Sequence, residues 1–319
     1  MKKITILLLT LAIIASPIFA QGSDEKTSTD KISIGFSQCT LDSPFYVALM
    51  DAAKAEAQSQ GVEFTYLDAQ SDVQKQNNDI MDLINKGVDV LLINPVDPDG
   101  VTPSVESAKR AGIPIVSVDR SINGEIDSLI GRDNTVMGKV AGDLAVALLG
   151  GKGNAKGKIL EVQGAAGGVV MMNRRDGFHQ AVDQESGITV IQSPYCDYVR
   201  SKAVKATQDI IQAHPDIDLI YAHNDDMALG ALQVFEQNGK KVHVVGVDGL
   251  MEAVKAIMDG RYDGTAMNDP AVLGTLAVQT AIKLANGETV EKFVDGGTGL
   301  IDSSNAAKFY NEGNTFATK

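Results

Sequence analysis

Polar side chains follow five of the apolar segments of the sequence, and their types suit the binding of a small polar ligand. Carboxylate, amide and guanidinium groups pair well with adjacent hydroxyl groups, because each hydroxyl both donates and accepts hydrogen bonds. Phe45, Tyr46 and Tyr198 could cover the weakly apolar C–H face of a sugar ring. One polar residue after a strand could be only a helix cap, but five such places are harder to explain in that way. These residues are Asn94, Asp119 with Arg120, Asn224 with Asp225, Asp248 and Asn268.

Residue patterns for catalysis, phosphate binding or metal binding are not found in the sequence. The Gly- and Lys-rich stretch 150–158 fits neither the Walker spacing nor GxGxxG, and we interpret it as a surface turn. No GxSxG motif offers a nucleophile, and the four histidines show no metal-ligand spacing. Asp119, Asp248 and Arg174 could in principle serve an isomerase or a hydrolase, but no acid and base pair is evident. We therefore expect a protein that is not an enzyme and that needs no cofactor and no metal.

Apolar strands and amphipathic helices alternate along the chain from residue 31. Ser43 and Pro44 are typical of an N-cap and a first helical residue, and Gly61 and Gly87 are expected to end two helices. The expected strands are 31–37, 62–67, 88–93, 114–118, 127–131, 158–162, 188–192, 217–222, 242–247 and 263–267. The expected helices are 44–60, 73–86, 101–111, 135–149, 173–184, 200–213, 226–238, 250–259 and 270–286.

This alternation is typical of the α/β class, in which parallel sheets are covered by helices on both faces. A single sheet of about a dozen strands would be unusual. We therefore expect two lobes, each built on a doubly wound parallel sheet. Ligands of such folds bind outside the carboxyl ends of the strands. The polar residues named above follow predicted strands, which places them where a ligand would bind.

The composition indicates a globular protein with an acidic surface. Of the 319 residues, 44% are hydrophobic and 22% are charged, which is enough to build a core. The formal net charge of −13 would repel phosphate backbones, so general nucleic-acid binding is not expected. With only two cysteines, Cys39 and Cys196, the chain cannot be a disulfide-dense scaffold.

The first twenty residues have the layout of a secretory signal peptide. Met1-Lys2-Lys3 is basic, residues 4–15 are uncharged and apolar, and Ala20 is a suitable cleavage residue. An uncleaved anchor is the alternative, but the apolar run is short of the roughly 20 residues that span a bilayer. Residues 21–30 are polar and are expected to form a flexible leader. The mature protein is therefore expected to be exported to a periplasm.

Six motifs in order resemble the periplasmic sugar-binding proteins of the ribose-binding type, which serve ATP-driven (ABC) importers. The resemblance covers residues 31 to about 300. It rests on the motifs IGFS…DSPFY (34–46), LLINPVD (91–97), IVSVDR (115–120), NRRDGF (173–178), AHNDDMALG (222–230) and VVGVDG (244–249).

The resemblance implies the type 1 fold of periplasmic binding proteins, in which two lobes are joined by three hinge segments and close around a ligand. The N-terminal lobe would comprise residues 31–131 plus 269–295. The C-terminal lobe would comprise residues 132–268 plus 296–319. Cys39 and Cys196 would lie in different lobes, and because a bridge would lock the hinge, we expect two free thiols.

The resemblance also assigns a ligand-binding set. Four members differ from the ribose binders: Ser43 replaces Asn, Tyr46 and Tyr198 replace Phe, and Asn268 replaces Gln. Two of these changes add a hydroxyl group, and two shorten a side chain and could leave space. The expected ligand is therefore a monosaccharide such as ribose, a ketohexose (fructose or psicose) or a related pentose. The whole set is Ser43, Phe45, Tyr46, Asn94, Asp119, Arg120, Arg174, Tyr198, Asn224, Asp248 and Asn268.

Several residues near this set keep two interpretations. Arg174 is expected in the cleft and Arg175 outside it, both at the start of a helix. Met171 and Met172 could narrow the cleft mouth or could pack in the interior. Gln38 could contact the ligand, although a structural role is favoured. Asp225 with Asp226 is expected to be a charge pair at a helix N-terminus.

Three other functions were weighed against an ABC importer's binding protein. An enzyme lacks support for the reason given above. A regulator of the lactose-repressor type would carry a helix-turn-helix where this chain has its predicted signal peptide. A sensor module could present a sugar or autoinducer-2 to a chemoreceptor or a sensor kinase, and the sequence does not separate that role from delivery to a permease. We expect a monomer with a monosaccharide and a membrane permease as partners.

Overall fold

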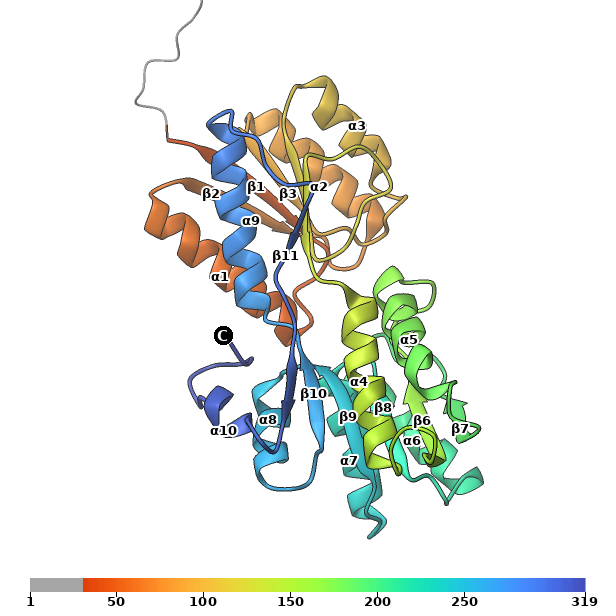
Figure 1. Ribbon diagram of the computed structural model, residues 1–319. Helices are drawn as coiled ribbons and strands as arrows, with labels where there is room; N and C mark the ends of the chain where they lie inside the picture. Colours follow the sequence, from red (N-terminus) through yellow and green to blue (C-terminus); the bar gives the residue numbers. More distant parts are fainter. Residues whose placement is uncertain (1–30, 319) are drawn as a thin grey trace, which may run out of the picture. The chain divides into compact units, whose positions relative to one another are not determined.

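Two six-stranded sheets organise the computed structural model, which describes residues 31–318 (Figure 1). The predicted signal peptide (1–20) and leader (21–30) lie outside the described residues. The first sheet is entirely parallel and has the order β11 (Phe293–Asp295), β5 (Ser128–Gly131), β4 (Ile115–Val118), β3 (Val90–Ile93), β1 (Ser33–Gln38) and β2 (Glu63–Asp68). The second has the order β12 (Leu300–Asp302), β10 (Gly264–Met267), β9 (His243–Asp248), β8 (Leu219–Ala222), β6 (Lys156–Val162) and β7 (Gly187–Gln192).

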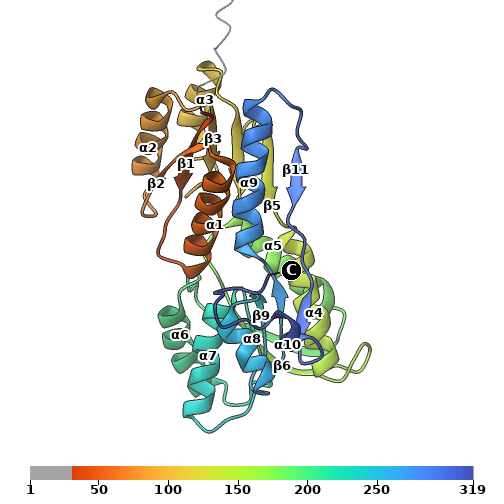
Figure 2. The ribbon, with the colours of Figure 1, turned by 90° about the vertical axis from the view of Figure 1, so that its left-hand side faces the viewer.

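Helices cover both faces of each sheet, and we call each sheet with its helices a lobe. In the first lobe, α1 and α9 pack side by side over one face, and α2 and α3 pack together over the other (Figure 2). In the second lobe, α4 packs against α5, and α6 packs against α7. The helices are α1 (Pro44–Gln60), α2 (Val73–Lys86), α3 (Thr102–Arg110), α4 (Asn134–Leu148), α5 (Val169–Val182), α6 (Arg200–Ala213), α7 (Asp225–Gln237), α8 (Met251–Met258), α9 (Pro270–Ala285) and α10 (Ala306–Phe309).

Strand β3 shows why its sequence is a continuous apolar run. Val90 and Leu92 belong to the core under α1 and α9, whereas Leu91 and Ile93 belong to the core under α2 and α3. Successive side chains of a strand point to opposite faces, so a strand covered on both faces must be apolar at every position. The same rule explains why the central strands could be recognised in the sequence.

The chain passes between the two sheets three times. It does so after Gly131 at the end of β5, after Met267 at the end of β10, and after Asp295 at the end of β11. As a result α9, which follows the second-sheet strand β10, packs on the first lobe against α1 and β3. These passages occur near the expected hinge segments, and the lobe boundaries given above stay a prediction.

The structure corrects three sequence-based expectations. Strand β12 is antiparallel to β10, because the chain leaves the carboxyl end of β11 and enters the second sheet from its carboxyl edge. Helix α5 begins at Val169 rather than at residue 173, so Arg174 and Arg175 lie in its second turn. Strands β11 and β12 and helix α10 were not expected, since each is short and lacks the continuous apolar run that marks the central strands.

Close packing of α4 on α5 depends on glycine. A Cβ atom at Gly138 would lie 2.1 Å from the carbonyl oxygen of Arg174, and one at Gly177 would lie 2.0 Å from that of Thr135. Only glycine permits this approach, which brings the start of α4 beside Arg174. Within residues 31–318, none of the helices is both long enough and apolar enough to cross a lipid bilayer.

Candidate functional site

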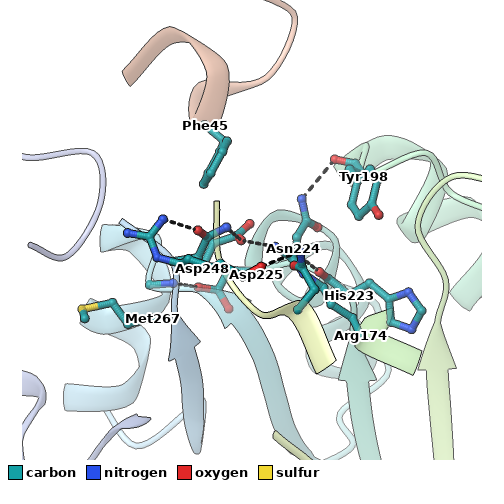
Figure 3. Close-up of polar contacts among 12 residues, drawn as sticks. Phe45, Arg174, Tyr198, His223, Asn224, Asp225, Asp248 and Met267 are labelled. Carbon is teal, nitrogen blue, oxygen red and sulfur yellow. Dashed lines mark hydrogen bonds and ion pairs between the residues drawn. The ribbon is translucent and has the colours of Figure 1, made fainter. Parts of the chain in front are cut away.

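A cavity of about 500 Å³ lies where residues from both lobes meet at the carboxyl ends of the strands. Every predicted ligand-binding residue except Asn94 lines it. Figure 3 shows Phe45 reaching from α1 toward the polar residues of the second lobe, with Tyr198 to one side. A larger hollow of about 1030 Å³ lies at the amino ends of second-sheet strands and contains none of the predicted residues. The 500 Å³ cavity is therefore the candidate site.

The first-lobe wall combines aromatic rings with an arginine and a carboxylate. Ser43 Oγ caps α1 by accepting a hydrogen bond from the Phe45 amide at 3.3 Å. The rings of Phe45 and Tyr46 meet edge to face, with centroids 5.6 Å apart. Arg120 donates to the Tyr46 hydroxyl and, at 3.2 Å, to the carbonyl of Pro95. These contacts hold the rings and the guanidinium in place around the cavity.

Asp119 is available to a ligand. Its φ of 64° lies in the left-handed region, which is strained for a residue other than glycine and is typical of functional positions. Among residues 31–318, no group donates a hydrogen bond to its carboxylate. Burial raises the pKa of Asp119, while the charges of Arg120 and Arg174 oppose that rise. The carboxylate therefore faces the cavity with its acceptor capacity unused.

Arg174 and Asp248 form a buried ion pair on the second-lobe wall. Arg174 Nη2 lies 3.2 Å from Asp248 Oδ1, and the two side chains are 5% and 9% exposed. Arg174 also donates to Asn134 Oδ1 at 2.9 Å and to the carbonyl of His223. Burial raises the pKa of Asp248 to about 6, against the effects of Arg174 and of a 3.0 Å hydrogen bond from Asn268. Asp248, like Asp119, has a positive φ, here 124°.

Asn224 and Tyr198 complete this wall. Asn224 is the N-cap of α7, since its Oδ1 accepts a hydrogen bond from the Met227 amide at 2.9 Å, and it also lines the cavity. Its amide nitrogen donates to the Tyr198 carbonyl at 3.3 Å. The Tyr198 hydroxyl is buried without a hydrogen-bond partner in the described part of the chain. The cap and the ligand-contact interpretations of Asn224 are thus compatible.

Arg132 is a residue of this region that sequence reasoning missed. It is 7% exposed and donates to the Gly297 carbonyl at 2.6 Å, to Asn268 Oδ1 at 2.8 Å and to the Asp269 carbonyl at 2.8 Å. It therefore ties together all three passages between the sheets. Burial lowers its pKa to about 10. It follows the predicted strand 127–131, so the strand-end rule could have found it.

The contacts of Asn268 with Arg132 and Asp248 show that its shorter side chain does not leave the space that was expected. Asparagine in place of glutamine was expected to leave space for the ligand. Its Oδ1 accepts from Arg132 and its Nδ2 donates to Asp248, so both ends of the amide are engaged by the protein. Asn268 therefore links the hinge region to the Arg174–Asp248 pair while it lines the cavity.

Asp225 is not only a charge at the N-terminus of α7, because its carboxylate also holds the turn that follows the site residue Asp248. It accepts hydrogen bonds from the amides of Gly249 and Leu250 and from the hydroxyls of Tyr262 and Thr265, at 2.7–2.9 Å. Burial and the charge of Asp248 raise its pKa to about 7 against these donors. The contacts fix the turn that follows Asp248. Its neighbour Asp226 pairs with Arg200 at 2.9 Å.

A buried cluster lies behind Arg174. His223 Nε2 lies 2.9 Å from Glu161 Oε1, and His179 Nε2 lies 3.2 Å from Glu161 Oε2. Burial alone would raise the pKa of Glu161, but the two histidines lower it to about 2. The hydrogen bond to Glu161 raises the pKa of His179 to about 9, whereas burial lowers the pKa of His223. Neutral His223 can therefore donate to Glu161 from one ring nitrogen and accept the Gly164 amide with the other.

The remaining predicted residues lie outside the cavity or beside it. Arg175 pairs with Asp176 at 2.7 Å, and Met171 is buried within the second lobe. Neither Met171 nor Met172 lines the cavity, which favours the packing interpretation. Cys39 and Cys196 are both buried and free, and Cys39 lines the cavity. Asn94 is buried behind the first-lobe wall. Within residues 31–318, no group of His, Cys, Asp and Glu side chains could hold a metal ion.

Comparison with known proteins identifies the family. Residues 34–289 match a family model described as a periplasmic binding protein domain. The ribose import binding protein of Bacillus subtilis (strain 168) is 36% identical over 292 residues, covering 91% of this chain and 93% of that protein. The galactofuranose-binding protein of Escherichia coli (strain K12) is 32% identical over 254 residues, covering 76% of this chain and 79% of that protein.

A solved structure is more similar still. An ABC transporter solute binding protein from Mycobacterium smegmatis, with bound glycerol, is 57% identical with a TM-score of 0.87, covering 91% of this chain and all of that one. The chain belongs to the periplasmic binding proteins, in the ribose-binding type. The family and the two-lobed α/β fold expected from the sequence are thereby confirmed. These relatives are binding proteins, as expected for a protein that is not an enzyme.

Proposed function

We propose that this protein captures a monosaccharide between its two lobes and delivers it to an ABC importer. The observation that carries the proposal is the cavity whose polar groups come from both lobes. Asp119 and Arg120 extend from the first sheet, and Arg174, Asn224 and Asp248 from the second lobe. These side chains match the paired donors and acceptors of neighbouring hydroxyl groups. The relatives named for ribose import and for galactofuranose bind ligands of this kind.

Contacts from two lobes provide a mechanism. A sugar that bonds to both walls stabilises the arrangement in which the lobes lie close together, and a membrane partner can recognise that arrangement. The aromatic rings of Phe45, Tyr46 and Tyr198 exclude water from the cavity and cover the C–H face of the sugar. Among the described residues, the Tyr198 hydroxyl has no hydrogen-bond partner and no group donates a hydrogen bond to the Asp119 carboxylate, so a ligand can supply both contacts.

The proposed ligands are ribose, a ketohexose such as fructose or psicose, or a related pentose. By the resemblance to ribose binders, Tyr46 and Tyr198 each add a hydroxyl group to a phenylalanine ring. The Tyr46 hydroxyl is held by Arg120, while that of Tyr198 has no partner among the described residues. The Tyr198 hydroxyl therefore favours a sugar with a hydroxyl group at that position. We also propose that the protein acts as a monomer in the periplasm after cleavage near Ala20.

A ligand screen tests the proposal. The purified protein, freed of bound ligand, is heated with each member of a panel of pentoses, hexoses, polyols and amino acids. A ligand at 100 times its Kd adds about 2.7 kcal/mol of stability, which raises the Tm by roughly 5 °C. We expect one sugar to give such a rise, and calorimetry then supplies its Kd. A panel in which only amino acids raise the Tm would contradict the proposal.

Delivery to an importer is a separate part of the proposal. Uptake of the radiolabelled sugar is compared in cells with and without this protein. We expect loss of high-affinity uptake in its absence. Unchanged uptake together with normal sugar binding would favour the sensor alternative, in which the loaded protein signals to a chemoreceptor or a sensor kinase.

A further inference from the structure

Two neighbouring amide side chains at the end of the first sheet have no hydrogen-bond partners. Gln38 and Asn94 are both 0% exposed. The oxygen and the nitrogen of each amide lack a partner in the described part of the chain. Buried amides are almost always hydrogen-bonded, because an unpaired one loses its contacts with water and gains nothing in return. Two such groups side by side therefore require an explanation.

The two amides lie next to each other at the edge that faces the cavity. Gln38 ends β1, and Asn94 follows β3, which pairs with β1 in parallel. The backbone N–H of Asn94 donates to the backbone carbonyl of Ser37 at 2.9 Å, so Asn94 continues the pairing of β3 with β1. Cys39, directly after Gln38, and Val96, two residues after Asn94, both line the cavity. The amides thus lie directly behind its first-lobe wall.

A third buried side-chain amide at this edge of the sheet has hydrogen-bond partners from the protein. Gln76 of α2 is also 0% exposed. Its nitrogen donates to Ser37 Oγ at 3.3 Å and to the Asn94 carbonyl at 2.8 Å, and its oxygen accepts from the Val96 amide at 2.7 Å. Gln76 is therefore a structural glutamine with every bond made. Gln38 has none of these bonds, which argues against a structural role for it.

We propose that Gln38 is a specificity-determining residue, whose amide acts with that of Asn94 on adjacent hydroxyl groups of the sugar. This inference rests on the proposed function. Two amides offer two carbonyl oxygens as acceptors and two NH2 groups as donors, which matches two hydroxyls that each donate and accept. Gln38 directly precedes Cys39, which lines the cavity, and the three rotatable bonds of a glutamine side chain allow its amide to be reoriented when a ligand binds. A sugar that lacks one of the hydroxyls leaves an amide unpaired again and is rejected.

Gln38→Met and the matched control Gln76→Met test the proposal, since methionine keeps the length of glutamine without its amide. Thermal unfolding is measured without ligand, and calorimetry is carried out with D-ribose, D-fructose, D-psicose and their deoxy analogues. For Gln38→Met we expect a Tm that rises by roughly 2–6 °C, because an unpaired buried amide is removed. We expect its affinity for the bound sugar to fall by about 10- to 100-fold. For Gln76→Met we expect a lower Tm.

The ligand series separates recognition from mere structural support. For Gln38→Met we expect a smaller ratio between the affinities for the sugar and for its deoxy analogue, because the amide that hydrogen-bonds the hydroxyl group has been removed. Unchanged affinity, or an equal loss for every ligand together with a lower Tm, would overturn the assignment. If the wild-type protein binds no sugar, the proposed function fails as well. If it binds and Gln38→Met keeps the same affinity and preference, only the assignment of Gln38 fails.

Discussion

Replacement of Arg132 by methionine tests how the two lobes are joined. Arg132 itself lies in the passage after β5, and its guanidinium donates three hydrogen bonds to the other two passages, one to Gly297 and one each to Asn268 and Asp269. Hydrogen bonds from a charged donor contribute about 1.5–3 kcal/mol each. Burial opposes them, since the fall of the Arg132 pKa to about 10 corresponds to about 3 kcal/mol against the charged form. We therefore expect Arg132→Met to lower the free energy of unfolding by ~2–4 kcal/mol.

Urea unfolding at neutral pH measures this loss. Arg132→Lys is the matched control, because lysine keeps the charge but has one donor group in place of three, and we expect an intermediate loss. Gly296→Ala disturbs the same contacts without changing Arg132, since a Cβ atom at residue 296 would lie 2.9 Å from the guanidinium carbon of Arg132. Free energies of unfolding for Arg132→Met and Gly296→Ala within about 0.5 kcal/mol of the wild type would refute the role of this contact.

Three further changes probe the site and its support. Arg174→Met leaves the Asp248 carboxylate buried without its cation, so urea unfolding should show a loss of about 3–5 kcal/mol, which Asp248→Asn in the same chain partly restores. Gly164→Ala places a Cβ atom 2.5 Å from the Tyr198 ring, so calorimetry should show about 10-fold weaker sugar binding. The pKa of His179 is raised to about 9, so the stability gained from its protonated ring is fully present below pH 6.5 and is lost as the pH rises through 9. His179→Gln should therefore lower the free energy of unfolding by ~1–2 kcal/mol at pH 6 and by almost nothing above pH 10. Urea unfolding of the variant and the wild type over this pH range measures the difference.

Each of these expectations has a contrary result. A loss for the Arg174→Met and Asp248→Asn double variant equal to the sum of the single losses would mean that the pair is not coupled. Sugar binding by Gly164→Ala at wild-type affinity would mean that the position of the Tyr198 ring does not matter. A constant difference between His179→Gln and the wild type at every pH would mean that the His179 charge contributes nothing.

The architecture could be predicted because the central strands carry strong local signals. They are short apolar runs covered on both faces, and most of them are followed by a helix. Two of the helices end at a recognisable glycine, Gly61 at φ 69° and Gly87 at φ 76°. Elements after residue 290 have no such signals. The direction of β12 depends on the edge at which the chain enters the second sheet, which is a property of the whole fold and not of three residues.

The site was predictable as a set of residues but not as a network. Strand ends brought together Asp119, Arg120, Asn224 and Asp248, because parallel strands end at a common edge. Which atoms are already paired could not be predicted, since the partners are far apart in the sequence. Arg132 and Asn268 are 136 positions apart, and their contact turns a predicted space beside Asn268 into a hydrogen bond.

One sugar in contact with both lobes is the central claim, and calorimetry of one variant from each lobe tests it most directly. The sugar that gives the largest Tm rise is titrated into the wild-type protein, Asp119→Asn and Asp248→Asn. We predict one sugar per chain for the wild type and about 10- to 100-fold weaker binding for each variant. Wild-type affinity in either variant would contradict the claim, because the sugar would then rest on one lobe alone.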